Sequence, residues 1–218
     1  MENILKKHFV CDALILTKRD FGEGHLSAMC LTKDHGPIRA FAFGGKRISK
    51  RFKGSLEYFR IMEIEFIGKQ TNGELIFTLS SVKSTKHTYK NISKDINKFI
   101  TACYIQELAS TIINPLERIG KDEAHFYDTV IDSLEKTDAA TSNNNEYLID
   151  IAYNFCIKLF HDTGFIPRLK TDTNTAKQLN QMEELHSSVL GNSPKSFLML
   201  TEIISNTCQI KDSSGRSR

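Results

Sequence analysis

The period of the hydrophobic pattern changes along this chain, from two in the first 83 residues to that of a helix beyond residue 92. Five short segments alternate in apolar side chains and are separated by turns: 9–18, 25–33, 38–43, 55–67 and 74–82. This alternation is typical of strands, and five closely spaced strands favour a small closed barrel. We therefore expect an α+β chain, with an N-terminal five-stranded OB-fold barrel followed by an all-α helical domain.

Turn residues and a break in the pattern divide the chain. Turns are expected at residues 20–24, 33–37 and 68–73, where Asn72-Gly73 is a hairpin signal. The strand pattern breaks between residues 83 and 91. We therefore expect three parts in order along the chain: an OB-fold domain at 1–84, a helical domain at 92–210 and a flexible tail at 211–218.

Helical spacing is found throughout the second part. Helices are expected at about 93–113, 122–136 and 145–163, with a weaker one at 176–186 and a last one from Pro194. Ser93 is the expected cap of the first helix. Its early apolar stripe is Ile96, Phe99, Ile100 and Cys103. The stripe of the third helix is Leu148, Ile151, Ala152, Phe155 and Leu159.

The charge of the chain is concentrated in one stretch. Six basic residues and no acid stand between His35 and Leu56, namely Arg39, Lys46, Arg47, Lys50, Arg51 and Lys53. The whole chain has 29 basic and 26 acidic residues, so without these six the basic residues number 23 and the remainder is net acidic. A positive stretch of this kind indicates a polyanionic partner such as nucleic acid.

The segment 38–43 places aromatic rings beside these cations. The register with Ile38, Ala40 and Ala42 inward avoids burying Arg39, so Arg39, Phe41 and Phe43 are expected on the outer face. Cations beside exposed aromatic faces are typical of proteins that bind single-stranded nucleic acid. In the alternative interpretation, Arg39 lies at the barrel rim and both rings belong to the core.

Composition and cysteine spacing indicate an intracellular protein. No apolar run approaches the roughly 20 residues that span a bilayer, and no signal-peptide pattern opens the chain. The five cysteines are widely spaced and form no CxxC motif, so we expect buried, reduced thiols. We therefore expect a cytoplasmic, nucleoid-associated protein with no membrane contact.

Catalytic patterns are weak, and we expect no enzyme. Gly44-Gly45-Lys46 lacks the first glycine of a phosphate-binding loop, and Arg47 stands where that loop needs Ser or Thr. Glu63 and Glu65 are interpreted as the solvated side of a strand, and Asp20 and Glu23 as turn residues. His161-Asp162 is interpreted as a solvated helix end rather than a metal site.

Several spaced motifs resemble one bacterial family. They are Arg19-Asp-Phe-Gly-Glu-Gly24, Leu31-Thr-Lys-Asp-His-Gly36, Ile38-Arg39, Gly44, Lys46-Arg47, and Ser49-Lys-Arg-Phe52 before Gly54-Ser-Leu56. Their order and spacing are similar to those of the N-terminal domain of the DNA repair protein family RecO. The segment 155–169, with Leu159, Gly164-Phe165 and Pro167, resembles part of that family's helical domain.

The resemblance implies a recombination mediator without catalytic turnover. Such a protein binds single-stranded DNA, anneals complementary strands and helps load the recombinase RecA. It implies RecR as a partner, together with single-strand-binding protein and its acidic C-terminal tail. The family's basic OB face corresponds here to Arg39, Lys46, Arg47, Lys50 and Arg51, to which the charge pattern adds Lys53.

One residue and one segment depart from the family pattern. A basic residue is common in the family where Phe43 stands, so base stacking is expected to replace a phosphate contact there. Many members carry a four-cysteine zinc module after the segment that matches 167–169. Residues 170–191 contain no cysteine, so we expect no zinc and a reduced or rebuilt connection in place of the module. We also expect no other cofactor.

Other functions fit parts of the same pattern. A protein-docking adaptor would use the basic loop to bind acidic tails, and an RNA-binding OB protein would use the same cations and rings. A metal-dependent nuclease is a further alternative. The pattern does not indicate whether Lys83, Lys86 and Lys90 extend the nucleic-acid track.

Overall fold

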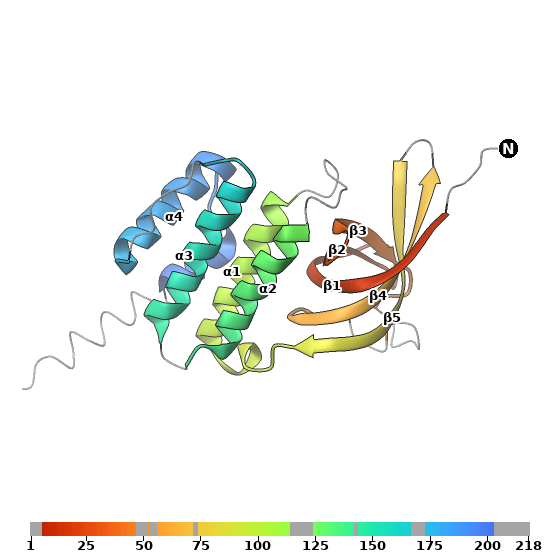
Figure 1. The fold of residues 1–218 in the computed structure, drawn as a ribbon, viewed down its shortest axis with the longest axis horizontal. Coiled ribbons are helices and arrows are strands. Elements are labelled where there is room, and N and C mark those ends of the chain that lie inside the picture. Colours follow the sequence, from red (N-terminus) through yellow and green to blue (C-terminus); the bar gives the residue numbers. More distant parts are fainter. Residues whose placement is uncertain are drawn as a thin grey trace, which may run out of the picture. The chain divides into compact units, whose positions relative to one another are not determined.

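The computed structural model describes residues 6–46, 52, 56–71, 74–113, 124–141, 144–166 and 173–202. Within these ranges, five strands are followed by helices (Figure 1), which confirms the predicted α+β class. The strands are β1 (Lys6–Asp20), β2 (Leu26–Thr32), β3 (Gly36–Ala42), β4 (Arg60–Thr71) and β5 (Glu74–Thr88). The helices are the short 3-10 helix η1 (Ile92–Lys94), then α1 (Ile96–Ile112), α2 (Ala124–Ala139), α3 (Asn145–Asp162) and α4 (Thr175–Leu190). Residues 195–202 are also helical.

The five strands close into a barrel in the order β1-β2-β3-β5-β4. The long strand β1 pairs with β4 along its first part and with β2 along its second part, and this double pairing closes the sheet. All pairs are antiparallel except β3 with β5, which is parallel. Closure removes the exposed edges that an open sheet of this size would have.

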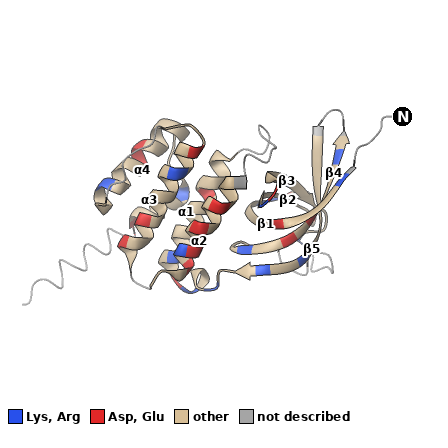
Figure 2. Cartoon of the chain, viewed as in Figure 1, with Lys and Arg blue, Asp and Glu red and all other residues tan. Residues whose placement is uncertain are grey.

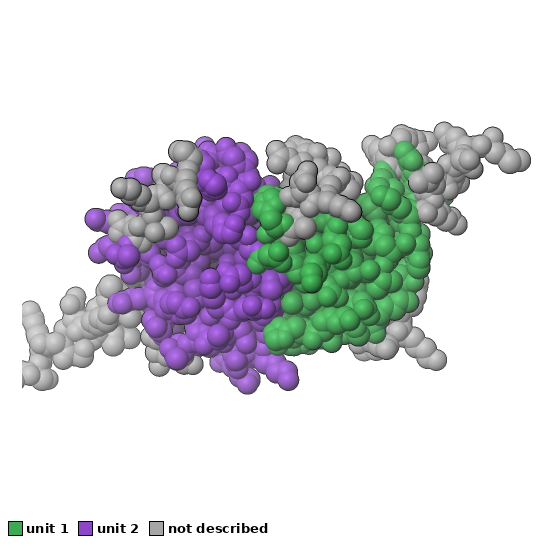
Figure 3. Space-filling view, viewed as in Figure 1, with its two compact units in different colours: residues 1–88, 113–128 green, residues 89–112, 129–218 purple. Residues whose placement is uncertain are grey.

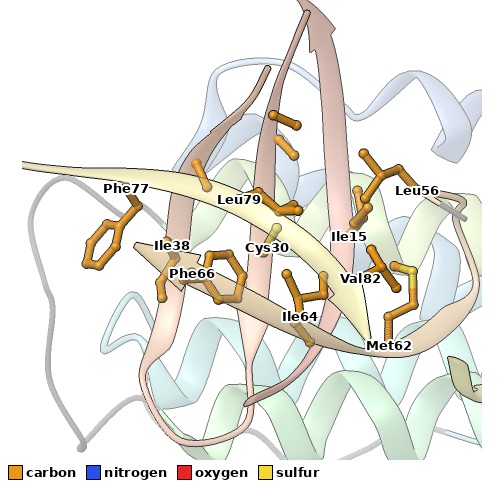
Figure 4. Packing of buried hydrophobic residues seen from close by; sticks show 14 of the residues in the cluster. Ile15, Cys30, Ile38, Leu56, Met62, Ile64, Phe66, Phe77, Leu79 and Val82 are labelled. Atoms are coloured by element: carbon orange, nitrogen blue, oxygen red, sulfur yellow. The ribbon is translucent and has the colours of Figure 1, made fainter. Parts of the chain in front are cut away.

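The barrel interior is filled by one face of each strand, as Figure 4 shows for Ile15, Cys30, Ile38, Ile64 and Phe66. Ile38, Ala40 and Ala42 of β3 are at most 1% exposed, so the register predicted for this strand is confirmed. The small Ala40 and Ala42 leave room in the barrel interior for larger core side chains such as Phe66 and Phe77.

Two strand boundaries differ from those predicted. β4 begins at Arg60 rather than near residue 55, because Phe59 has a φ of +58°, which no strand accommodates. β5 continues to Thr88, so the break predicted at Lys83 is wrong. Its last residues keep pairing with β4, as in Thr88 with Arg60. Residues 68–71, predicted as part of a turn, belong to β4, and Asn72-Gly73 lies outside the described residues.

The start of α1 also differs from the prediction. Asp95 caps the helix, its Oδ1 accepting the N–H groups of Asn97 (2.9 Å) and Lys98 (3.2 Å), whereas the Ser93 hydroxyl donates to the Lys90 carbonyl. Its predicted apolar stripe is wrong as well. Ile96 and Phe99 are exposed, and the buried apolar face consists of Ala102, Tyr104, Ile105, Leu108 and Ala109. Apolar residues surround α1, so periodicity alone does not identify its buried face.

The remaining helices follow the predicted pattern more closely. The predicted stripe of α3 is buried throughout, and Gly164 after it has a φ of +79°, the left-handed conformation that ends helices. α4 extends the weak prediction at 176–186 on both sides. α2 runs to Ala139, beyond the end predicted at residue 136. Thr137 is buried within it, and its hydroxyl donates to the Ser133 carbonyl.

The chain forms two compact units (Figure 3). The first consists of residues 1–88 and 113–128, and the second of residues 89–112 and 129–218. The inclusion of 113–128 in the barrel unit is not evident from the sequence. Among the described residues, Cys11, Cys30 and Cys156 are buried free thiols and Cys103 is half-buried. No helix within the described ranges is long and apolar enough to span a membrane.

Candidate nucleic-acid interface

β3 directs its alternate side chains to the outside of the barrel. Arg39 is exposed, Phe41 is half-buried and Phe43, directly after the strand, is 44% exposed. The alternative with both rings in the core is therefore wrong. Pairing with β2 sets Arg39 opposite Met29 and Phe41 opposite Ser27. The two rings are 6.4 Å apart between centroids and inclined by 29°.

Two further rings join these from the turn between β1 and β2. The Phe21 centroid lies 4.7 Å from that of Phe41, and the His25 centroid lies 5.4 Å from that of Phe43. Phe21 is 46% exposed. We call Phe21, Phe41, Phe43 and His25 the ring cluster. Its members come from two segments that the β2–β3 pairing brings together.

Hydrogen bonds connect this turn to the chain after β3. The Gly44 N–H donates to Nδ1 of His25 (2.8 Å), and the Lys46 N–H donates to the Gly24 carbonyl (3.3 Å). The Lys46 ammonium also lies 2.6 Å from an Asp20 carboxylate oxygen. Both side chains are well exposed, so this ion pair is weak and leaves the ammonium accessible to a phosphate.

Four predicted site residues, Arg47, Lys50, Arg51 and Lys53, lie outside the described residues. Phe52, which stands between Arg51 and Lys53, is described. It is 1% exposed and belongs to the barrel core.

Lys18 of β1 contacts the residues that follow the basic stretch. Its ammonium donates to the Leu56 carbonyl (2.6 Å) and lies 4.5 Å from the centre of the Tyr58 ring, while its N–H donates to the Tyr58 hydroxyl (3.1 Å). Leu56 is 4% exposed and packs in the core. Phe52 and the 56–58 segment therefore pack against the barrel.

Three residues of this surface were missed by sequence reasoning. Arg19 is exposed and lies in the same cross-strand row as Ser27 and Phe41. Phe21 and His25 flank a turn that was interpreted only as a turn. The motif Arg19-Asp-Phe-Gly-Glu-Gly24 was the sequence signal that could have indicated them, because it places an arginine and a phenylalanine beside two glycines.

The lysines of β5 differ from those of the basic stretch because they are paired with acids of β4. Lys86 lies 2.9 Å from Glu63, and Lys83 lies 2.9 Å from Glu65, which also contacts His8 at 2.7 Å. Figure 2 marks acidic and basic positions along these strands. Hydrogen bonds from Ser81, Lys83 and His8 lower the pKa of Glu65 to about 2. The predicted solvated glutamate face is therefore a half-buried ladder of ion pairs.

His161 and Asp162, which were interpreted as a solvated helix end, are neighbours at the end of α3. The imidazole Nδ1 of His161 lies 3.3 Å from Asp162, whose second oxygen binds Lys158 at 2.6 Å. Within the described part of the chain, no three His, Cys, Asp or Glu side chains gather in a way that would hold a metal ion.

Comparison with known proteins finds relatives of this barrel. Residues 7–87 match the family model described as "Recombination protein O N terminal". The chain is 24% identical over 169 residues to the DNA repair protein RecO of Caldanaerobacter subterraneus subsp. tengcongensis, covering 78% of this chain and 63% of the relative. It is 30% identical over 93 residues to that of Thermodesulfovibrio yellowstonii, covering 43% and 36%.

A third relative matches a shorter part of the chain. The DNA repair protein RecO of Myxococcus xanthus is 35% identical over 65 residues, covering 30% of this chain and 26% of the relative. The matched part thus spans between about a quarter and just under two thirds of these three relatives. The resemblance predicted from the spaced motifs is confirmed, because residues 7–87 of this chain match the model of RecO N-terminal domains and the chain is similar to proteins named DNA repair protein RecO.

Proposed function

We propose that this chain acts in DNA repair as a recombination mediator. In this role it binds single-stranded DNA, anneals complementary strands and helps load the recombinase RecA onto DNA coated with single-strand-binding protein, in partnership with RecR. It performs no catalytic turnover. The proposal is supported by the match of residues 7–87 to the RecO N-terminal domain and by relatives named DNA repair protein RecO.

The observation that carries the proposal is the outer face of β3. An exposed arginine stands two residues before the first of two aromatic rings on a closed five-stranded barrel, and a lysine follows them. Among the described residues, Arg39 forms no ion pair, whereas Lys83 and Lys86 are neutralised by glutamates. Accessible cations bind the phosphate backbone, and accessible rings stack on bases. The DNA-binding residues proposed are Arg39, Phe41, Phe43 and Lys46, together with Arg47, Lys50, Arg51 and Lys53.

The direct test is fluorescence anisotropy of a labelled single-stranded oligonucleotide at several salt concentrations. We expect affinity to fall steeply with salt, because bound cations release counterions from the DNA. Arg39→Gln removes one phosphate contact and should weaken binding and reduce the slope of log affinity against log salt by about 0.7. Lys33→Gln, at an exposed lysine of the β2–β3 turn, is the matched control and should change neither quantity. Salt-independent binding by the unaltered chain would contradict the proposal.

The annealing step needs its own assay. Unlabelled complementary strand is added to the preformed complex, and duplex formation is followed against the spontaneous rate. We expect the unaltered chain to accelerate duplex formation and Arg39→Gln to accelerate it less. Binding without acceleration would leave a single-strand-binding module and remove the annealing role.

A protein-docking adaptor is the second candidate, and exposed apolar side chains of the second unit favour it. Ile96 and Phe99 of α1 are 68% and 41% exposed, and Leu198 and Met199 of the last helix are 61% and 54% exposed. Exposed apolar patches on a folded unit mark interaction sites. This function predicts binding of an acidic peptide by a chain that does not bind DNA, and the same anisotropy assay with a labelled peptide distinguishes the two candidates.

A further inference from the structure

The turn between β1 and β2 has a defined conformation. The Phe21 N–H donates to the His25 carbonyl (3.1 Å), which closes the turn. Gly22 and Gly24 have φ values of +61° and +74°, which side chains other than hydrogen rarely permit. The hydrogen bond from the Lys46 N–H to the Gly24 carbonyl joins the turn to the chain that follows β3. The turn is therefore held beside the outer end of β3.

The rings on this side of the barrel form one continuous row. Phe21 contacts Phe41, Phe41 neighbours Phe43, and Phe43 meets the edge of His25 at an interplanar angle of 73°. Nearly half of the surface of Phe21 and of Phe43 is accessible. Adjoining rings that stay accessible to water indicate a surface that another flat, apolar face covers. A nucleobase has such a face.

His25 fixes the position of the ring at the end of this row. Its Nδ1 accepts the Gly44 N–H, which in a neutral imidazole places the ring proton on Nε2. Its ring meets that of Phe43, the residue before Gly44. The imidazole therefore holds both the backbone and the side chain at the end of β3, and loss of the Nδ1 acceptor would release both.

We propose that this turn is the second half of the nucleic-acid site. Phe21 stacks on an unpaired nucleobase beside Phe41 and Phe43, and His25 is a positioning residue for Phe43. This inference rests on the proposed function and adds Phe21 and His25 to its single-strand site. The bases of a duplex are stacked on one another and offer no free face to these rings, so the ring cluster selects single strands over duplex.

The first test measures the contribution of Phe21. We expect Phe21→Ala to weaken binding of a single-stranded oligonucleotide about tenfold. The slope of log affinity against log salt should stay unchanged, because a base rather than a phosphate loses its contact. Binding of a duplex of the same sequence should also stay unchanged. Ile76→Ala is the matched control, since Ile76 lies on β5 of the same barrel with 41% of its surface exposed. Single-strand affinity equal to that of the unaltered chain would overturn the inference.

The second test separates positioning from direct contact. His25→Leu removes the acceptor for the Gly44 N–H, and His25→Asn supplies an amide oxygen in its place. We expect His25→Leu to weaken binding as much as Phe43→Ala does, because without His25 the Phe43 ring is no longer held in place for stacking. The double variant His25→Leu/Phe43→Ala should weaken binding no further, since both changes affect the same ring. His25→Asn should recover part of the affinity. Additive losses in the double variant would overturn the positioning role.

A measurement on the unaltered chain guards against variants that fold poorly. An oligonucleotide containing 5-iodouracil is cross-linked by ultraviolet light, and the modified residues are mapped by mass spectrometry. We expect cross-links at Phe21 as well as at Phe41 or Phe43, and cross-links confined to other segments would overturn the inference. Binding by the unaltered chain with no effect of Phe21→Ala overturns this inference alone. Absence of any binding overturns the proposed function and this inference with it.

Discussion

A single buried histidine distinguishes the interior of the second unit. His186 of α4 is fully buried, and its Nε2 lies 2.9 Å from the Tyr104 hydroxyl and 3.8 Å from the Cys156 sulfur. The rings of Phe160 and Phe197 pack around it. Within the described residues, its Nδ1 is buried with no hydrogen-bond partner. Burial lowers the pKa of His186 to about 4.

This burial predicts that the second unit loses stability in mild acid. The unfolded chain protonates the histidine below its ordinary pKa of about 6.5, whereas the folded chain does not until about pH 4. Stability that is present above pH 6.5 is therefore lost as the pH falls through this interval. The measurement is the urea midpoint as a function of pH, compared with that of His186→Leu, for which we expect a shallower loss. His161→Gln, at an exposed histidine of the same unit, should follow the unaltered chain, and equal pH dependence in all three would contradict the prediction.

Among the elements, the last helix depends on a side chain from α1. The Glu107 carboxylate accepts the N–H groups of Lys195 (3.0 Å) and Ser196 (2.9 Å) and the Ser196 hydroxyl. Burial would raise the pKa of Glu107, but the hydrogen bonds from Ser196 and Lys195 outweigh it, so the pKa lies below its ordinary value. This carboxylate serves as the cap of residues 195–202 and ties them to α1.

Loss of this cap has a predictable effect. We expect Glu107→Ala to lower the free energy of unfolding of the second unit by about 1–2 kcal/mol, because it leaves two helix N–H groups without an acceptor. Urea denaturation followed by helical circular dichroism measures the change. Glu135→Ala, at an exposed position of α2, is the control and should change stability little. A midpoint for Glu107→Ala equal to that of the control would show that the helix is held by packing alone.

The elements also show where the sequence predicted the structure and where it did not. Strands with one buried face were predicted well, because a period of two leaves one register for Ile38, Ala40 and Ala42 that avoids burying Arg39. The buried face of α1 was not predicted, since Phe99 and Tyr104 are both apolar and only tertiary packing decides between them. Their environments depend on α3 and α4, which the local pattern does not contain.

The candidate site was predicted in its strand half only. Arg39 and Phe41 lie on β3 and Phe43 directly follows it, so alternation was enough to place them on one face. Phe21 and His25 approach that face only through the β2–β3 register and the hydrogen bond from Gly44 to His25. These are long-range contacts, and a turn motif does not reveal which strand end it will meet.

For the whole molecule, the arrangement of charge on the barrel limits the path of the DNA. Lys83 and Lys86 are held by Glu65 and Glu63, and these ion pairs leave the β4–β5 face nearly neutral. Hydrogen bonding and charge attraction from Glu63 raise the pKa of Lys86. Phosphate binding there would require these ion pairs to break. We therefore expect the single-stranded DNA to follow the face of the barrel formed by β1, β2 and β3.

This path predicts that changes at the β5 lysines and a change at Arg39 of β3 affect DNA binding differently. We expect the double variant Lys83→Gln/Lys86→Gln to keep the salt slope and the single-strand affinity of the unaltered chain, whereas Arg39→Gln lowers both. Anisotropy at several salt concentrations compares them directly. A loss of affinity in the double variant equal to that in Arg39→Gln would extend the DNA track onto β5.

The first compact unit is assembled from two separate stretches of chain, 1–88 and 113–128. During synthesis, all five strands leave the ribosome before the residues that complete their unit, and 89–112 of the other unit emerge in between. The unit that contains the barrel is therefore complete only after residue 128 has been released, when part of its neighbour has already been made. Synthesis couples the two units in time, so a nascent chain arrested near residue 100 has a complete barrel sequence but an unfinished unit.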